Sequence, residues 1–300
     1  MTTISKDNLF FAFNPDNPPV ARVQLGEVVT LETHDCFEGQ LQTEDDLVTN
    51  LNWEHINPAT GPVFIEGVEP GDILRVDLLK VEIAEQSSMV TMPGEGALGG
   101  LITQTETTIL RRDGNDLIFK GRIRVPQTPM IGVLGVAPAE GAVANGTPGP
   151  HGGNMDCTLI SQGNRVYFTV GVTGALFGAG DMHAAMGDGE IVVCGAETAG
   201  RIRFRPELVA LAGLPTPFVE TPELVAVIYS AENVDLAAQG AIEGMAQFLT
   251  GLVKLPINDA GMLMSLVGQL KFCQVVDPLK TVRFEFPKSV LKQCGFKMPA

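Results

Sequence analysis

The sequence is poor in cysteine, and the cysteines that it has are widely spaced. There are five in 300 residues: Cys36, Cys157, Cys194, Cys273 and Cys294. An odd number without a Cys-x-x-Cys pair argues against a disulfide framework and against a zinc site built from four cysteines. The sequence therefore predicts reduced thiols, as is typical of a cytoplasmic protein.

Lysine and arginine are also scarce. The chain has 20 of them against 35 Asp and Glu, which gives a net charge of −15. An acidic surface repels nucleic-acid phosphates and anionic lipids, so neither nucleic acid nor a membrane is expected as a partner. No apolar run approaches the roughly 20 residues that span a bilayer, and the first residues lack a secretory-signal pattern. We expect a cytoplasmic protein that acts on a small molecule.

The motifs of several enzyme classes are missing. No Gly-x-Gly-x-x-Gly opens a helix after a strand, and no P-loop is present, which argues against nucleotide-binding folds. The chain has neither a Gly-x-Ser-x-Gly nucleophile elbow nor a His-Glu-x-x-His zinc helix. Cys157 is a poor nucleophile candidate, because the adjacent Asp156 carboxylate is expected to raise its thiol pKa.

The sequence is rich in short β-strand patterns. It contains 34 glycines and 20 prolines, and this spacing of turn residues favours short strands over long helices. Strands are predicted at residues 22–33, 72–83, 107–111, 116–125, 157–161, 165–172, 189–195, 200–205, 224–230 and 281–286. Residues 40–52 read as a short helix or an irregular insertion.

Helical spacing of apolar residues appears only near the end of the chain, at 233–251 and 258–269, each after a capping Asn or Asp. We therefore predict an α+β fold, mainly β. Sandwich-like sheets in residues 1–225 would hold the functional site, and a smaller α+β portion in residues 226–300 would pack on that core.

The segment from Thr147 to Gly200 concentrates the polar residues that can carry chemistry. His151, Gly152, Gly153 and Asn154 lie in a glycine-rich turn that ends at Asp156. Adjacent glycines allow the backbone to approach a ligand closely, so this turn can expose amide groups to an oxyanion or place an acid near a metal. A plain hairpin turn with a capping Asn explains the same residues equally well.

Two further pairs lie in this segment. Asp181 and His183 are two residues apart, so on an extended strand both side chains point to the same face and offer oxygen and nitrogen donors to a divalent ion. A structural hydrogen bond between them is the alternative. Glu190, two residues after Asp188, is predicted to begin the strand at 189–195, where an acid can act as a general base. Upstream, Asp35 ends a predicted strand and is either a functional acid or a turn cap.

These pieces together resemble the acetamidase/formamidase family. The similar segments occur in the family's order, as THDCFEGQ at 33–40, GPVFIEGVEPGDILRVDLL at 61–79, MIGVLGVAP at 130–138, GPHGGNMD at 149–156, GDMHAAMGDGE at 180–190 and GAETAG at 195–200. Formamidase-like members carry Glu-Asn where this chain has Pro150-His151, which places it nearer the acetamidase-like branch. The last 70 or so residues match less distinctly.

The resemblance implies a cytoplasmic, homo-oligomeric hydrolase that releases ammonia and a carboxylate from short amides with the help of a divalent metal. Zinc is the first choice, and calcium is an option for a second ion. The residues that match the family's motifs suggest a working scheme. In this scheme the metal ligands are Asp35, Asp156, His183 and, as a less secure candidate, His151; the proton carrier is Glu190 or Asp181; and the oxyanion site is Gly152, Gly153 and Asn154.

Two other hypotheses stay open from the sequence. The chain could be a non-catalytic β-sandwich that binds a small ligand or Ca²⁺, with Asp188 and Glu190 as oxygen ligands. It could also be a hydrolase for a larger or cyclic amide, because the depth of the pocket depends on how loops 40–60 and 92–101 pack.

Overall fold

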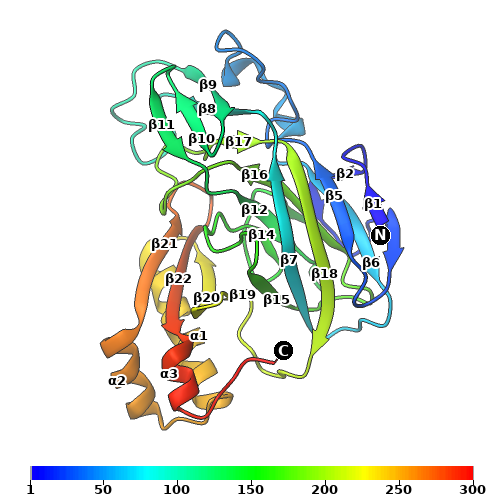
Figure 1. The fold of residues 1–300 in the computed structure, drawn as a ribbon, viewed down its shortest axis with the longest axis vertical. Coiled ribbons are helices and arrows are strands. Elements are labelled where there is room, and N and C mark those ends of the chain that lie inside the picture. Colours follow the sequence, from blue (N-terminus) through cyan, green and yellow to red (C-terminus); the bar gives the residue numbers. More distant parts are fainter. Residues whose placement is uncertain (1, 300) are drawn as a thin grey trace.

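The computed structural model describes residues 2–299 and shows two large β-sheets with helices at one end (Figure 1). The predicted α+β fold, mainly β, is confirmed. In Figure 1 the helices lie at the lower left, and the strands β8 to β11 project at the upper left.

The first sheet has nine strands and runs the length of the molecule. In spatial order they are β1 (Thr2–Ile4), β5 (Val29–Thr33), β18 (Gly200–Val209), β7 (Ile73–Ile83), β15 (Arg165–Thr169), β19 (Phe218–Glu220), β20 (Leu224–Ala231), β22 (Lys280–Pro287) and β21 (Gln269–Gln274). The long strands β7 and β18 lie side by side at its centre (Figure 1).

The second sheet has eleven strands. Its main path is β11 (Ile123–Pro126), β10 (Asp116–Phe119), β9 (Glu106–Asp113), β8 (Gln86–Thr91), β17 (Glu197–Thr198), β16 (Phe177–His183), β12 (Met130–Gly135) and β14 (Gly152–Asn154). β6 (Ala59–Ile65) pairs with β16 and also with β2 (Leu9–Phe10) and β4 (Ala21–Val23). A separate small sheet joins β3 (Ala12–Phe13) to β13 (Val143–Ala144).

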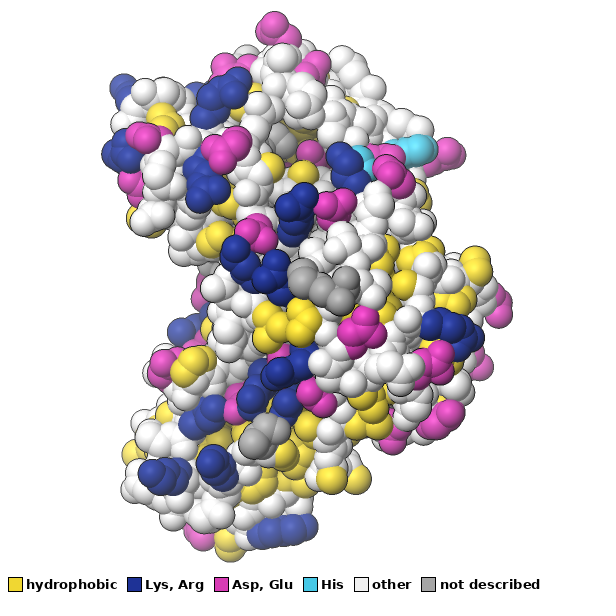
Figure 2. All heavy atoms as spheres, turned by 45° about the vertical axis from the view of Figure 1, so that its right-hand side comes forward, with side chains coloured by type: hydrophobic (Ala, Val, Ile, Leu, Met, Phe, Trp, Pro, Cys, Tyr) yellow, Lys and Arg dark blue, Asp and Glu magenta, His cyan; other side chains and the backbone are white. Residues whose placement is uncertain are grey.

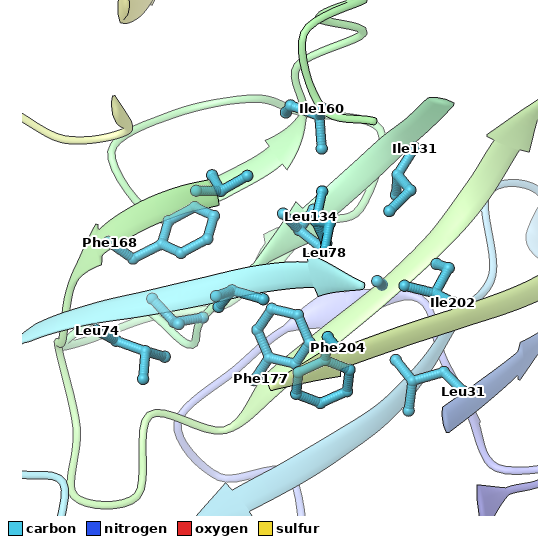
Figure 3. Close-up of a cluster of buried hydrophobic side chains, with 14 of the residues drawn as sticks. Leu31, Leu74, Leu78, Ile131, Leu134, Ile160, Phe168, Phe177, Ile202 and Phe204 are labelled. Atoms are coloured by element: carbon cyan, nitrogen blue, oxygen red, sulfur yellow. The ribbon is translucent and has the colours of Figure 1, made fainter. Parts of the chain in front are cut away.

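The two large sheets share one apolar core. Figure 3 shows side chains of the first sheet, such as Leu78 and Phe204, facing those of the second, such as Leu134 and Phe177. Phe177 and Phe204 lie with ring centroids 4.7 Å apart. This burial follows from the strand period of two, which turns every second side chain inward. The core fixes the positions of β12 and β16, on which the candidate site is built.

The C-terminal part extends the first sheet instead of forming a separate one. β20 begins at Leu224. It pairs with β19 on one side and with β22 on the other. Three helices, α1 (Val234–Gly251), α2 (Ile257–Val267) and α3 (Lys288–Gln293), cover this end. The Asn233 side chain caps α1 by accepting from the Leu236 N–H, as its place before the apolar periodicity predicted.

Several predicted elements differ from the structure. Residues 157–161 and 189–195 form turns, not strands. Residues 40–52 are irregular, with the short 3₁₀ helices η1 (Val48–Asn50) and η2 (Trp53–His55) at their end. The predicted strand at 22–33 is split by a turn into β4 and β5.

None of the helices in residues 2–299 is long and apolar enough to cross a membrane. On the face shown in Figure 2, acidic side chains lie beside basic ones. Exposed ion pairs on β7, β18 and β5 include Lys80–Glu82 at 2.6 Å and Arg201–Glu32 at 3.0 Å.

Candidate metal centre

Three neighbouring strands of the second sheet bring the central polar residues together. β12 pairs with β14 on one side and with β16 on the other. Asp156 lies two residues after β14, whereas Asp181 and His183 lie at the end of β16. Asp156 and Asp181 adopt left-handed backbone, with φ of 44° and 49°. Such conformations are costly for residues other than glycine and are concentrated at functional sites.

The imidazole of His183 is surrounded by carboxylates. Its Nε2 lies 3.1 Å from Glu197 Oε1, 3.5 Å from Asp181 Oδ1 and 3.7 Å from Asp156 Oδ1. His183, Asp156 and Asp181 are almost fully buried. The prediction that Asp181 and His183 face the same way is therefore confirmed.

Glu190 reaches the same place from a turn. The predicted strand at 189–195 is wrong, because Glu190 and Val193 have positive φ of 46° and 85° and the segment folds back on itself. Gly189 attaches this turn to β21 by donating to the Cys273 carbonyl and accepting from the Val275 N–H. A donor atom of Glu190 lies within 4.8 Å of donor atoms of Asp156 and His183.

Sequence reasoning missed Glu197, Cys36 and Asp277. Glu197 lies directly opposite His183 in the β16–β17 pair, and its donor atom is within 4.8 Å of those of Cys36 and Asp181. Asp277 Oδ2 accepts a 2.8 Å hydrogen bond from Asn154 Nδ2. Glu197 and Cys36 carried a signal, since they lie in the family-like segments GAETAG and THDCFEGQ, whereas Asp277 lies outside all of these segments. We call Asp156, Asp181, His183, Glu190 and Glu197 the donor cluster.

Two predicted ligands make other contacts in this structure. Asp35 Oδ1 accepts hydrogen bonds from the N–H groups of Phe37 and Gly39, so Asp35 caps a turn. His151 is buried with its ring edge against Phe13, at a centroid distance of 5.2 Å. Neither belongs to the two groups of closely spaced donor atoms found within residues 2–299. Their roles as ligands stay predictions.

The predicted oxyanion turn needs a correction. The N–H of Gly152 donates to the Gly149 carbonyl at 3.0 Å, so it is not available to a substrate. Gly152 and Gly153 have φ of 103° and 76°, and a Cβ on Gly153 would lie 2.4 Å from the Thr147 carbonyl oxygen. These glycines therefore serve close backbone packing. Asn154, in contrast, keeps its Oδ1 buried without a hydrogen-bond partner.

Burial and mutual repulsion raise the pKa of most carboxyl groups here. The pKa of Asp156 lies well above its ordinary value because of burial and the nearby Glu190. Burial also raises the pKa of Glu190 well above its ordinary value. Burial, opposed by His183, brings the pKa of Glu197 to about 7, and burial with Asp181 nearby brings that of Asp277 to about 7.

His183 and Asp181 shift in the opposite sense to what burial alone would do. Burial lowers the pKa of a histidine, but Glu197 and Asp181 outweigh it and hold the pKa of His183 well above its ordinary value. Burial raises the pKa of a carboxyl, but His183 outweighs it and lowers that of Asp181. A cation at this position is therefore strongly favoured.

The donor cluster fits a divalent metal ion. Both oxygens of Asp156 and the atoms Asp181 Oδ1, Glu190 Oε2 and Glu197 Oε2 are buried without a hydrogen-bond partner. Uncompensated buried carboxylates are costly unless they bind a cation. Ligand atoms about 2.0–2.1 Å from a tetrahedral zinc lie about 3.3 Å from one another. The observed separations of 3.1, 3.5 and 3.7 Å around His183 Nε2 agree with such a spacing.

Two glycines make room for the donor cluster. A Cβ on Gly132 would lie 2.5 Å from Asp156 Oδ1 and 2.9 Å from Asp181 Oδ2. A Cβ on Gly195 would lie 2.7 Å from His183 Nδ1. Any side chain at either position would force the ligands aside, which explains why glycine occupies both.

A cavity of about 390 Å³ opens onto the donor cluster. Its polar end is lined by Asn154, Asp181, Glu190, Glu197 and Asp277. The remaining lining is mainly apolar and comes from residues 36–57, β8 and the loops at 92–95, 193 and 276–278. A concave apolar pocket that ends in a few convergent polar groups is the usual form of a small-molecule site.

Two neighbouring side chains have structural partners. Asp188, considered above as a calcium ligand, binds Arg283 through two contacts of 2.6 and 2.8 Å, so that role is wrong. For Cys157 the expected direction of the pKa shift is also wrong. Burial raises the pKa of this thiol, but Cys273 and Arg283 outweigh burial and the net pKa is lowered.

Comparisons with known proteins agree on one family. The profile of the acetamidase/formamidase family matches residues 2–146 and 139–231. The acetamidase structure from Bacillus halodurans is 40% identical, with a TM-score of 0.96, and the match covers 98% of this chain and 100% of the other. A structure described as a predicted acetamidase/formamidase, from Thermoanaerobacter tengcongensis, is 42% identical, with a TM-score of 0.96 and 99% of each chain covered.

A curated relative is more distant. The formamidase of Methylophilus methylotrophus is 28% identical over 257 residues, which cover 66% of this chain and 63% of that protein. The chain thus spans somewhat less than two thirds of this relative's length. Asp277 lies beyond residue 231, where the family profile ends.

Proposed function

The chain belongs to the acetamidase/formamidase family, and on this premise we propose that it hydrolyses the C–N bond of short linear amides to ammonia and a carboxylate. The observation that carries the proposal is the donor cluster at the polar end of the cavity, where four buried acids surround one histidine. A binding protein would have less need for so many unpartnered carboxylate oxygens in its interior.

We propose that His183, Asp156, Asp181 and Glu197 hold a divalent ion, with zinc favoured by the mixture of imidazole nitrogen and carboxylate oxygen. When bound, the ion would supply Lewis-acid polarisation of the substrate carbonyl and a lowered pKa for water. Calcium as a second ion also remains a proposal. This assignment moves Asp181 from proton carrier to ligand, because its Oδ1 lies 3.5 Å from His183 Nε2.

Glu190 is the proposed proton carrier. Its Oε2 is buried without a hydrogen-bond partner, and its side chain lines the cavity. Oε2 would accept a proton from the attacking water and deliver it to the leaving amide nitrogen, so that water and amide give carboxylic acid and ammonia. Turn contacts between Gly189 and β21 hold Glu190 in place.

Asn154 is the proposed substrate-orienting residue. Asp277 fixes its side chain through the 2.8 Å hydrogen bond to Nδ2, which leaves Oδ1 free at the cavity. Oδ1 would accept a hydrogen bond from the substrate –NH₂ group and thereby turn the carbonyl carbon toward the donor cluster. An ester of the same shape lacks this donor and would be oriented less well.

The test is ammonia release from formamide, acetamide and propionamide by purified protein, before and after chelation. We expect release that stops when the metal is removed and returns when zinc is added. Amidase activity that persists in metal-free protein would overturn the metal assignment. Absence of ammonia release from every amide, by protein with its metal bound, would overturn the proposed activity.

Cytoplasmic location and homo-oligomeric assembly also remain proposals. Five free cysteines, with Cys36, Cys157, Cys194 and Cys273 buried as thiols, support a reducing environment. Sedimentation of the purified chain would give the number of subunits.

A further inference from the structure

The cavity beyond the donor cluster is larger than short amides need. Its volume is about 390 Å³. Acetamide occupies roughly three to four times the 30 Å³ share of a liquid water molecule, so it would leave most of this space to solvent. Pockets of about 300–1,000 Å³ usually hold ligands with many more atoms.

The wall of the cavity away from the acids is apolar. Phe37, Val48 and Ile56 come from the irregular segment after β5, and Met92 and Val193 close the other side. Most of these side chains belong to one apolar cluster that is separate from the core between the sheets. Phe37 and Val48 are already buried, but Ile56, Met92 and Val193 stay partly exposed. Their exposed surface gains free energy when an apolar group covers it, and an acetyl group is too short to cover it all.

Trp53 adds an aromatic surface at the same wall. It is the only tryptophan of the chain, lies on the 3₁₀ helix η2 and lines the cavity, although 57% of it is exposed. An exposed apolar surface that continues into a groove marks a ligand-binding site, and Trp53 continues the apolar lining of this cavity. An acyl chain extending from the donor cluster would bury part of the indole ring.

The charges of the cavity restrict the acyl group further. Glu95 lines the cavity together with the acids of the polar end, and no lysine or arginine is among the lining residues in the described part of the chain. An anionic acyl group would meet repulsion without a compensating cation. A neutral acyl group meets no such barrier.

We propose that the preferred substrates are uncharged linear amides whose acyl chain has about four to eight carbons, and that Trp53 is a specificity-determining residue for them. This inference rests on the proposed amidase activity. The carboxamide lies at Asn154 and Glu190, and the chain extends along the partly exposed Ile56 toward Trp53. Each buried methylene is expected to raise kcat/KM about threefold to fourfold until the wall is covered.

The experiment compares formamide, acetamide, butyramide, hexanamide and the anionic amide succinamate with the metal-containing protein, by ammonia release. We expect kcat/KM to rise from acetamide to hexanamide and to be at least about tenfold lower for succinamate than for butyramide. If acetamide is hydrolysed and kcat/KM stays flat or falls with chain length, the inference is wrong while the amidase activity stands. If no amide is hydrolysed, the inference about chain length and the proposed amidase activity are both wrong.

Variants of Trp53 test whether this residue causes the preference for longer acyl chains. Trp53→Ala should lower the hexanamide-to-acetamide ratio of kcat/KM about tenfold, and Trp53→Phe should restore most of it. Leu266→Ala is the matched control, because Leu266 is also a large exposed apolar residue but lies on α2, at the other end of the molecule (Figure 1). An unchanged ratio in Trp53→Ala, or an equal change in the control, would contradict the role of Trp53.

Discussion

Two ionic clusters in this protein differ in whether their buried acids have cationic partners. In the first sheet, Glu220 accepts from Tyr167 Oη at 2.5 Å and contacts Lys288 Nζ at 2.5 Å and Arg165 Nη1 at 3.3 Å. We call these four residues the Glu220 cluster. The donor cluster of the second sheet sets four acids against one histidine and leaves several oxygens without partners. An acid that is paired with cations, such as Glu220, can serve structure alone, whereas several buried acids that share one histidine are costly unless a further cation compensates them.

The two clusters also differ in backbone geometry. Glu220, Arg165 and Tyr167 occupy regular antiparallel positions, since Arg165 lies opposite Glu220 in the β15–β19 pair. Asp156, Asp181 and Glu190 all have positive φ. Strain at three acids of one site indicates that their positions are determined by ligand geometry more than by backbone preference.

The largest expected effect comes from making one acid of the donor cluster neutral. Asp156→Asn keeps the size of the side chain but removes a charge and a ligand oxygen. We expect amidase kcat/KM to fall about a thousandfold and metal to be lost. The metal-free variant should be more stable than metal-free wild type, because repulsion with Glu190 is relieved. Kinetics and urea unfolding measure the two quantities, and a loss of stability in the metal-free state would contradict the account.

Making the acid of the Glu220 cluster neutral should lower stability and leave activity unchanged, the reverse of what is expected for Asp156→Asn. Glu220→Gln removes the charge that compensates Lys288 and Arg165, and breaking a buried pair costs about 3–5 kcal/mol. We expect a large decrease in the free energy of unfolding with kcat/KM per folded molecule within about twofold of wild type. A stable but inactive variant would show that the comparison between the clusters is mistaken.

The space beside the ligands can be tested without touching any of them. Gly132→Ala places a Cβ about 2.5 Å from Asp156 Oδ1, which forces the carboxylate aside. We expect metal affinity and activity to fall about 10–100-fold, as after loss of a supporting contact. Gly100→Ala is the control, because nothing lies within 4 Å of its Cβ position, it is exposed and, like Gly132, it has no positive φ. Equal metal affinity in the two variants would show that the space left by Gly132 is not needed for metal binding.

The smallest expected effect concerns His151, which lacks the acids that surround His183. Burial lowers its pKa from 6.5 to about 4. The folded protein thus binds this proton less readily than the unfolded chain, so the contribution to stability is complete above pH 6.5 and is lost as the pH falls toward 4. We expect about 2 kcal/mol to be lost between pH 6.5 and about pH 4.5. Unfolding of His151→Gln over this range should show a shallower decrease; an identical slope would contradict the assignment.

The sequence predicted the parts of the site that depend on local spacing. Asp181 and His183 were paired from their spacing of two residues on a predicted strand, which required no knowledge of partners. Their side chains do meet, although the left-handed backbone of Asp181 departs from regular strand geometry. Glu197 joins them only through the pairing of β17 with β16, and Asp277 arrives from residues far along the chain. No pattern in a single sequence specifies such pairings.

The same limit explains the errors in the fold. The run Glu190–Cys194 is apolar and β-branched, so it resembles a buried strand. In the structure Val193 lines the cavity and Cys194 lies in the apolar cluster beside it, so burial comes from the site and not from a sheet. The core strands were predicted better: the prediction at 72–83 agrees with β7, and the prediction at 200–205 covers the first part of β18.

The most direct measurement is the metal content of the purified protein, by elemental analysis, together with that of Asp156→Asn and Glu220→Gln. The account predicts at least one divalent ion per chain in wild type and in Glu220→Gln, little in Asp156→Asn, and amidase activity that follows the metal content. Wild-type protein that hydrolyses amides without a bound metal, or Asp156→Asn that retains the full metal content, would contradict it.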